Sequence, residues 1–288
     1  MSRSHLVKIL LNEINKQGIE LVYGKKLQSL SEETDGVTVY FEDGTNESGS
    51  LLIGADGTNS STRKAIFPHH HLRYDNTWAL YGVASLDKLS EAKDFFNQDA
   101  NLLFLKDNFG MMVGRSHMND KINLAWQIVG HKKRKMAKQD FEGKSIDEVK
   151  RDFEQLTQEW TYVPELIQKT DVVIPKQIFK IDPLPSWSLG RVALIGDAAH
   201  TTSPNAGYGS TFALEDAMYL SLMLKDNDYQ DAYFYYEFDR KERATTILES
   251  LEYFDFSKGT ASGNASVFGL SQDEENYKIN WGSSINNG

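Results

Sequence analysis

The stretch from Arg191 to Ala217, RVALIGDAAHTTSPNAGYGSTFALEDA, is the feature that most constrains how this chain folds. An apolar run at Val192–Ile195 predicts a short buried strand, and Gly196 permits a sharp backbone turn at its end. A helix is predicted to begin near Ser210 after a series of small and turn-forming residues. In α/β folds, ligands bind at the carboxyl ends of strands. We therefore expect this strand–loop–helix unit to hold a ligand, the alternative being a structural junction without one.

The loop carries residues suited to a flat ligand that also bears hydroxyl groups. Asp197 stands at the strand tip, where its carboxylate would accept hydrogen bonds from a sugar or polyol. Pro204, Gly207 and Gly209 suit a backbone that approaches a planar ring closely. The start of the next helix carries about half a positive charge, which would stabilise a heterocycle that becomes anionic on reduction.

A second stretch, LIGADGTNSSTR, places Asp56 and Gly57 after another apolar run that predicts a buried strand. Ser60, Ser61 and Arg63 follow just beyond it. An Asp-Gly pair after a strand is by itself only a turn signal. Its combination with the first stretch makes it a candidate part of the same site.

The segment from Tyr74 to Pro185 has a different character and predicts one antiparallel sheet followed by helices. Its strands are expected at 78–86, 101–105, 111–115 and 121–129, with a turn at Asn108-Phe109-Gly110, and its helices at 145–160 and 164–169. Outside this segment we expect helices at 2–16, 210–225 and 231–253, β runs at 19–23, 37–41 and 50–53, and an extended segment at 177–187.

Composition narrows the possible functions. The chain has 288 residues and no cysteine, which excludes disulfides and thiolate metal sites. A formal net charge of −10 argues against nucleic acid as the main partner. We expect no membrane span, because no run of about 18 apolar residues exists. No metal site is expected either, and the cytoplasm is the expected compartment.

The motifs resemble those of the FAD-dependent aromatic-hydroxylase-type monooxygenases, the family of para-hydroxybenzoate hydroxylase and the tetracycline-inactivating monooxygenases. The Asp-Gly and Gly-Asp stretches are similar to two motifs of that family. SRSHLVKILL resembles its helix that begins with an FAD-contacting arginine, here Arg3. PSWSLGRVALIGDAAH resembles its lead into the flavin loop, and YYEFDRKERA its C-terminal helix. The resemblance covers about residues 1–255.

The resemblance implies a site built around FAD. Asp197, after Gly196, would contact the ribityl or ribose hydroxyls, and Pro204 to Gly209 would lie against the isoalloxazine ring. Asp56 and Gly57 would belong to a stretch that the family uses for both FAD and nicotinamide.

The implied reaction is hydroxylation of an aromatic or polycyclic small molecule. NADH or NADPH would reduce the flavin, oxygen would form a peroxyflavin, and one oxygen atom would pass to the substrate. The cofactor carries this chemistry, so we name no catalytic acid or base. The sheet from Tyr74 to Pro185 would roof the substrate pocket. Candidates for its apolar lining, each of which is otherwise an ordinary core residue, are Trp78, Tyr81, Phe104, Met112 and Trp126.

The family's G-x-G-x-x-G motif has no match in this sequence. That motif opens a βαβ unit and binds the FAD pyrophosphate, and the resemblance implies roughly a hundred residues before Arg3 to hold it. GYGSTF has only the first two glycines and follows no strand directly. Without the pyrophosphate site, the binding free energy of FAD should become less favourable by several kcal/mol.

We therefore expect an α/β (α+β) architecture with a truncated Rossmann-like FAD-binding domain and an inserted antiparallel substrate domain. The FAD-binding domain would comprise residues 1–73 and 186–256, the substrate domain 74–185, and a polar tail 257–288. The start would reflect a truncated gene product, a misplaced start codon or one half of a split enzyme, with a partner chain supplying the βαβ unit. A non-catalytic remnant that cannot hold FAD alone is the alternative function.

Overall fold

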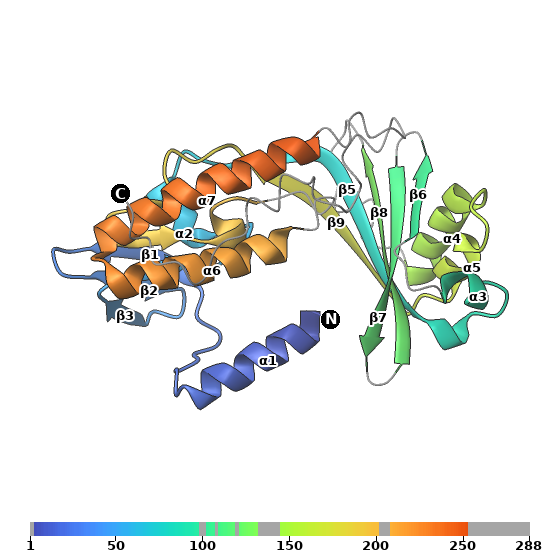
Figure 1. Ribbon diagram of the computed structural model, residues 1–288, viewed down its shortest axis with the longest axis horizontal. Coiled ribbons are helices and arrows are strands. Elements are labelled where there is room, and N and C mark those ends of the chain that lie inside the picture. The colour runs from blue at the N-terminus through green and yellow to red at the C-terminus, as the bar shows by residue number, and fades with distance from the viewer. Residues whose placement is uncertain are drawn as a thin grey trace.

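The computed structural model describes residues 3–97, 102–106, 109–118, 121–131, 145–201 and 208–252. These residues form two lobes joined by two long neighbouring strands, β5 (Leu72–Ser85) and β9 (Val172–Ile181) (Figure 1). The first lobe contains the described residues before β5 and after β9, and the second contains those between them. The expectation of a mixed α/β fold with an antiparallel sheet is confirmed.

The first lobe contains two small sheets, in one of which neighbouring strands run parallel. β1, β2 and β3 form an antiparallel sheet, and the second sheet has the order β10-β11-β4, with β11 parallel to β4. The elements of this lobe are α1 (Arg3–Lys16), β1 (Leu27–Glu32), β2 (Val37–Phe41), β3 (Asn46–Gly49), β4 (Leu52–Gly54), α2 (Ser61–Ile66), β10 (Ser188–Leu189), β11 (Val192–Leu194), the 3₁₀ turn η3 (Gly196–Ala198), α6 (Gly209–Asp226) and α7 (Tyr229–Glu252).

The core of the first lobe lies between β11 and the helix pair α6–α7. All three residues of β11 are fully buried, because the strand is covered by helices and flanked by β10 and β4. Tyr236 of α7 reaches the strand and donates a hydrogen bond from its hydroxyl to the carbonyl of Leu194 at 3.0 Å. The strand that carries the Gly-Asp loop is therefore rigidly held.

The second lobe is a five-stranded antiparallel sheet with the order β6-β7-β8-β5-β9, covered by helices on one face (Figure 1). Because side chains alternate between the faces of a strand, every second residue points to the helices. The remaining elements of this lobe are η1 (Leu86–Lys88), α3 (Lys93–Phe96), β6 (Leu102–Lys106), β7 (Phe109–Met118), β8 (Lys121–His131), α4 (Ile146–Thr157) and α5 (Val163–Gln168).

Two glycines of this sheet make room for tryptophan rings on the helix-covered face. Gly82 of β5 lies opposite Trp126 of β8, and Gly130 of β8 lies opposite Trp78 of β5. A Cβ atom on Gly82 would lie 2.2 Å from the indole of Trp126, which no real Cβ atom tolerates. The indole of Trp126 lies across the glycine and donates to Thr170 Oγ1 at 2.8 Å.

Most expected elements are present, with several differences, which include short elements that were not expected at 27–32, 61–66, 93–96 and 188–189. The β run expected at 19–23 is wrong: this segment is irregular, because the strand that pairs with β2 is 27–32. The extended segment expected from 177 begins earlier, as the strand Val172–Ile181, and it includes Pro175 because β9 is an edge strand. The strand Asn46–Gly49 was not expected. Asn108 of the expected turn lies outside the described residues.

Candidate functional site

Two loops from distant parts of the chain meet at one edge of the small parallel sheet. β4 and β11 are parallel neighbours, so both end at the same edge. The loop after β4 contains Asp56 and Gly57, and the loop after β11 contains Gly196 and Asp197. Thr58 Oγ1 donates to Asp197 Oδ2 at 3.4 Å and joins the two loops. The structure thus brings together the two stretches that the sequence singled out.

Gly196 forms the sharp turn that the sequence predicted. Its φ is +57°, a left-handed conformation that glycine adopts at little cost. Its carbonyl accepts hydrogen bonds from the backbone N–H groups of Ala199 and His200, both at 2.9 Å. Thr201 Oγ1 donates to the carbonyl of Asp197 at 2.7 Å. The turn is therefore a closed, one-turn structure that holds Asp197 at the strand tip, half-buried.

Asp56 has a structural role that the sequence did not indicate. Its carboxylate accepts hydrogen bonds from the backbone N–H groups of Ser61, at 2.8 Å, and Thr62, at 3.0 Å. It also accepts one from the hydroxyl of Ser60. Burial alone raises the pKa of Asp56, but these hydrogen bonds outweigh burial and lower that pKa. Asp56 thereby caps α2 and fixes the shape of its loop.

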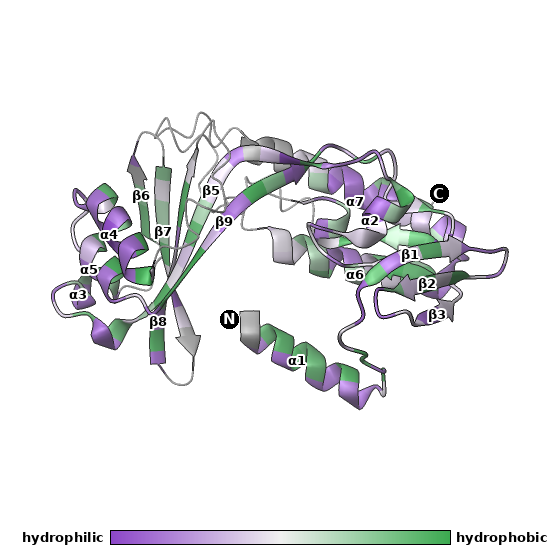
Figure 2. Cartoon of the chain, turned by 180° about the vertical axis from the view of Figure 1, so that it is seen from behind, coloured by the Kyte–Doolittle hydropathy of each residue, from purple (hydrophilic) through white to green (hydrophobic). Residues whose placement is uncertain are grey.

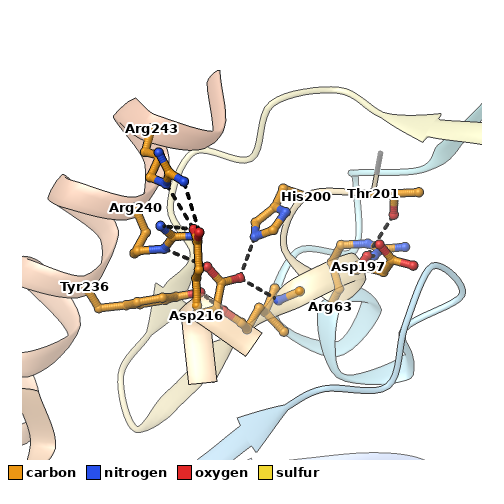
Figure 3. A network of polar contacts seen from close by, with 11 residues as sticks. Arg63, Asp197, His200, Thr201, Asp216, Tyr236, Arg240 and Arg243 are labelled. Atoms are coloured by element: carbon orange, nitrogen blue, oxygen red, sulfur yellow. Dashed lines mark hydrogen bonds and ion pairs between the residues drawn. The ribbon is translucent and has the colours of Figure 1, made fainter. Parts of the chain in front are cut away.

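Arg63 is the residue that ties the two loops together (Figure 3). Its Nη1 donates to the carbonyls of Ala198, at 2.9 Å, and Asp197, at 3.4 Å, and its Nη2 donates to that of Thr58 at 2.6 Å. The residue is only 1% exposed. Burial lowers the pKa of its guanidinium and the charge of Asp56 opposes this, but an arginine stays protonated. A buried cation therefore spans both loops.

A buried carboxylate, Asp216 of α6, holds the Gly-Asp loop from its other side (Figure 3). Asp216 Oδ2 accepts hydrogen bonds from the N–H of Gly196 at 2.8 Å and pairs with His200 Nε2 at 2.5 Å. Asp216 Oδ1 accepts from Nε of Arg240, in α7, at 3.0 Å. Burial raises the pKa of Asp216, whereas its hydrogen bond with His200 and the charges of His200 and Arg240 lower it below the usual value.

The neighbouring Glu215 extends this network toward the surface. It pairs with Arg240 Nη1 at 2.7 Å and with Arg243, which donates from Nε at 3.0 Å and from Nη2 at 2.9 Å. Consecutive residues of α6 thus pair with two arginines of α7. Sequence reasoning missed these residues, although the adjacent acids in the apolar helical run FALEDAMYL were a signal, because a charge on a buried face needs a partner.

The five expected pocket residues divide between the two faces of the large sheet. Trp78, Phe104 and Trp126 lie on the helix-covered face and pack in or against the core cluster. Trp78 and Trp126 are therefore buried in the core, as periodicity alone allowed, and Phe104 is partly buried against it. Tyr81 and Met112 lie on the opposite face, where both are half-buried. That face looks toward the first lobe (Figure 1).

Cross-strand pairing places a third side chain between these two. Gln127 of β8 lies opposite Tyr81 in one direction and opposite Met112 in the other. The three side chains therefore form one row on the face that looks toward the first lobe. Burial raises the pKa of the Tyr81 hydroxyl, so that this group stays protonated at neutral pH.

Several expected site residues are only partly described. Arg3 begins α1, and its side chain is not among the described ones. Pro204 and Gly207 lie outside the described residues. Gly209 is the first residue of α6, one position before the expected start.

The family of the chain is shown by a match to a family model. The model of the family described as FAD binding domain matches residues 1–249. The chain therefore belongs to the FAD binding domain family.

The relatives of the chain are aromatic-hydroxylase-type FAD monooxygenases. The chain is 30% identical over 233 residues to 6-hydroxynicotinate 3-monooxygenase of Bordetella bronchiseptica. The aligned region covers 79% of this chain and 58% of the relative. It is 26% identical over 269 residues to the FAD-dependent urate hydroxylase of Klebsiella pneumoniae, covering 90% of this chain and 65% of the relative. The chain thus spans less than two thirds of the length of these relatives.

Solved structures give the same result. The crystal structure of Klebsiella pneumoniae HpxO complexed with FAD and uric acid matches with a TM-score of 0.72 and 26% identity, over 86% of this chain and 61% of that one. Tetracycline destructase Tet(55), at 23% identity, shows the same fold with a TM-score of 0.68. Among the helices that the structure describes, none is long and apolar enough to span a bilayer.

The residues present fit one part of FAD. A Cβ atom on Gly57 would meet no atom of the described residues within 4 Å, so these residues leave room for a ligand beside the backbone of the two loops. Arg63 Nε is buried and has no hydrogen-bond partner among the described residues. The half-buried carboxylate of Asp197 suits the hydroxyls of a ribityl chain. The G-x-G-x-x-G motif that binds the pyrophosphate has no match in the sequence.

Proposed function

We propose that this chain forms the flavin-ring and substrate part of an FAD-dependent monooxygenase that hydroxylates an aromatic or polycyclic small molecule. NADH or NADPH would be the reductant and molecular oxygen the co-substrate. The observation that carries the proposal is the pair of loops, with Asp197 at the tip of β11, joined by buried Arg63. When bound, FAD supplies the oxygen-activating chemistry, and the protein supplies binding and orientation.

Each part of the described structure has a place in this function. The carboxylate of Asp197 would accept hydrogen bonds from the ribityl hydroxyls and so fix where the ring lies. The start of α6, with Gly209, would direct its partial positive charge toward the ring. The sheet face that carries Tyr81 and Met112 would cover the substrate and exclude water. Relatives act on 6-hydroxynicotinate and urate, which makes small aromatic heterocycles the first candidates.

We further propose that a βαβ unit with the G-x-G-x-x-G motif, outside this sequence, completes the cofactor site. β4 is an edge strand among the described residues, and its Ile53 is 36% exposed. Leu214, Met218 and Leu222 of α6 are all exposed and lie on one face of the helix. No described side chain of α1 is buried, and Figure 2 shows hydrophobic residues along this separate helix. Surfaces of this kind are usually covered by another layer.

Flavin binding to the 288-residue chain tests the proposal. Riboflavin and FAD should bind weakly and with affinities within about tenfold of each other, since only the ring and ribityl parts have a site. Asp197→Asn should weaken both, while Asp182→Asn, at an exposed ion pair with Arg73, should weaken neither. Quenching of flavin fluorescence measures the affinity of each flavin for the unmodified chain and for both variants.

Other outcomes decide between the alternatives. An affinity for FAD more than about a hundredfold above that for riboflavin would mean that the chain has its own pyrophosphate site. No binding of either flavin would favour the non-catalytic remnant. Fusion of the chain to the N-terminal unit of the Bordetella relative separates the two readings. Yellow flavin retained after gel filtration, with oxidation of NADH or NADPH, would support the proposed enzyme, and a colourless, inactive fusion would support the remnant. We also propose that this enzyme works in the cytoplasm.

A further inference from the structure

We propose that His200 is a positioning residue whose Nε2 hydrogen bond to Asp216 locks the Gly196–Thr201 turn into the shape that presents Asp197. The significance of this lock for flavin binding rests on the proposed function, whereas its effect on the turn does not.

The lock is built on one carboxylate that binds three donors, two from the turn and one from α7. Asp216 is fully buried and belongs to α6. It receives Gly196 N–H and His200 Nε2 from the two ends of the turn, and Arg240 Nε from α7 (Figure 3). Both ends of the turn are therefore fixed to the same residue of α6, which Arg240 in turn holds from α7.

The surroundings of His200 allow it only this polar attachment. The ring is 8% exposed, lies 4.6 Å from the ring of Trp187 and meets the ring of Phe212 edge-on at 5.8 Å. Its Nδ1 has no hydrogen-bond partner among the described residues. Since the Asp216 carboxylate is an acceptor, a neutral His200 must carry its proton on Nε2. The aromatic neighbours hold the ring, and the hydrogen bond sets its orientation.

The turn has other hydrogen bonds, but they act at other points. Within it, two backbone N–H groups converge on the carbonyl of Gly196, and Thr201 Oγ1 donates to the carbonyl of Asp197. Outside it, Arg63 contacts the carbonyls of Asp197 and Ala198. None of these bonds fixes the His200 end of the turn to α6. Loss of the Nε2 bond should therefore loosen that end first.

Hydrogen exchange of the backbone amides tests the lock without any ligand. His200→Leu keeps an apolar side chain of similar size but has no donor, whereas His200→Gln places an amide N–H near the position of Nε2. We expect His200→Leu to speed exchange of the amides at 196, 199 and 200 by about tenfold or more, the scale of one charge-assisted hydrogen bond. His200→Gln should stay within about threefold of the unmodified chain. Amides of β5 and β8 provide the internal control and should not change.

The outcomes separate positioning from general stabilisation. Equal exchange in the Gln and Leu variants, whether both fast or both slow, overturns the proposal, because the donor would then not matter. Faster exchange throughout the first lobe would also overturn it, since His200 would only stabilise the fold. If His200→Leu does not fold, His200→Asn, whose amide is too short to reach Asp216, replaces it.

Flavin binding supplies the second readout. His200→Leu should weaken riboflavin binding by about tenfold and His200→Gln should restore it. A loosened turn that binds riboflavin as tightly as before would overturn the positioning role while leaving the proposed function intact. If the unmodified chain binds no flavin, the proposed function fails for the chain alone, and the exchange experiment still decides whether the lock exists.

Discussion

Replacement of Arg240 by methionine should be among the most destabilising single changes in the first lobe. The Arg240 side chain is 2% exposed, and it pairs with Asp216, which is fully buried. Methionine preserves much of the length and packing of arginine but leaves Asp216 Oδ1 without its donor. Breaking a buried ion pair by removing one partner costs about 3–5 kcal/mol, because the remaining charge stays buried. In a unit of this size, each kcal/mol lowers the melting temperature by about 2–4 °C.

We therefore expect Arg240→Met to lower the melting temperature by roughly 6–20 °C, measured by circular dichroism of the 288-residue chain. The matched control is Arg73→Met, which breaks a pair with Asp182 whose side chains are 62% and 64% exposed. That change should cost no more than about 1 kcal/mol. If Arg240→Met lowers the melting temperature as little as the control does, the view that this network is a tightly coupled, desolvated unit is refuted.

The double variant Arg240→Met with Asp216→Asn gives an independent check on the same argument. If the cost of the single change comes mainly from an uncompensated charge, neutralising Asp216 should recover part of it. The double variant should then be more stable than the sum of the two single losses predicts. If the two single losses of stability add up to the loss in the double variant, the charge of Arg240 does not stabilise the charge of Asp216.

Three further changes test the sheet lobe and the capped loop. Gly82→Ala should cost about 1–3 kcal/mol or more and alter the near-UV circular dichroism of Trp126, because the new Cβ has no room. Ser145→Ala should cost about 0.5–2 kcal/mol in urea unfolding, since Ser145 and Glu148 form a capping box at the start of α4. The pKa of Asp56 is lowered in the folded chain, so its contribution is present above the ordinary value near 3.8 and is lost as pH falls below it. Stability should thus fall less steeply below about pH 4 in Asp56→Asn than in the unmodified chain.

The sequence predicted the elements whose signals are local. The helix Arg3–Lys16, the strand Val37–Phe41 and the strands of the large sheet follow from periodicity and from turn residues. The run at 19–23 failed because an apolar, β-prone segment becomes a strand only where a partner strand is available. The strand that pairs with β2 is instead 27–32, a segment with weaker β propensity. Pairing is decided by hydrogen bonding between strands and not by local propensity alone.

The pocket residues show a second limit of sequence reasoning. Alternation along a strand divides its side chains between two faces, but it does not say which face the helices will cover. Trp78 and Trp126 are large aromatic residues, and a helix-covered core favours such residues most strongly. Tyr81 and Met112 fall on the other face by the same alternation. Gln127 emerges between them only once the register of three strands is known.

The candidate site depends most on contacts that no local pattern encodes. Arg63 reaches carbonyls 134 and 135 residues further along the chain, and Arg240 reaches a carboxylate 24 residues before it. The motifs placed Asp56 and Asp197 at strand ends, but not the two buried cations that hold their loops in place. Burying these cations costs free energy, which their hydrogen bonds and ion pairs offset. Arg63 bonds to both loops directly, whereas Arg240 acts on the Gly-Asp loop only through Asp216, which accepts from Gly196 and His200. We infer that these two cations fix the positions of the loops as well as stabilise the fold.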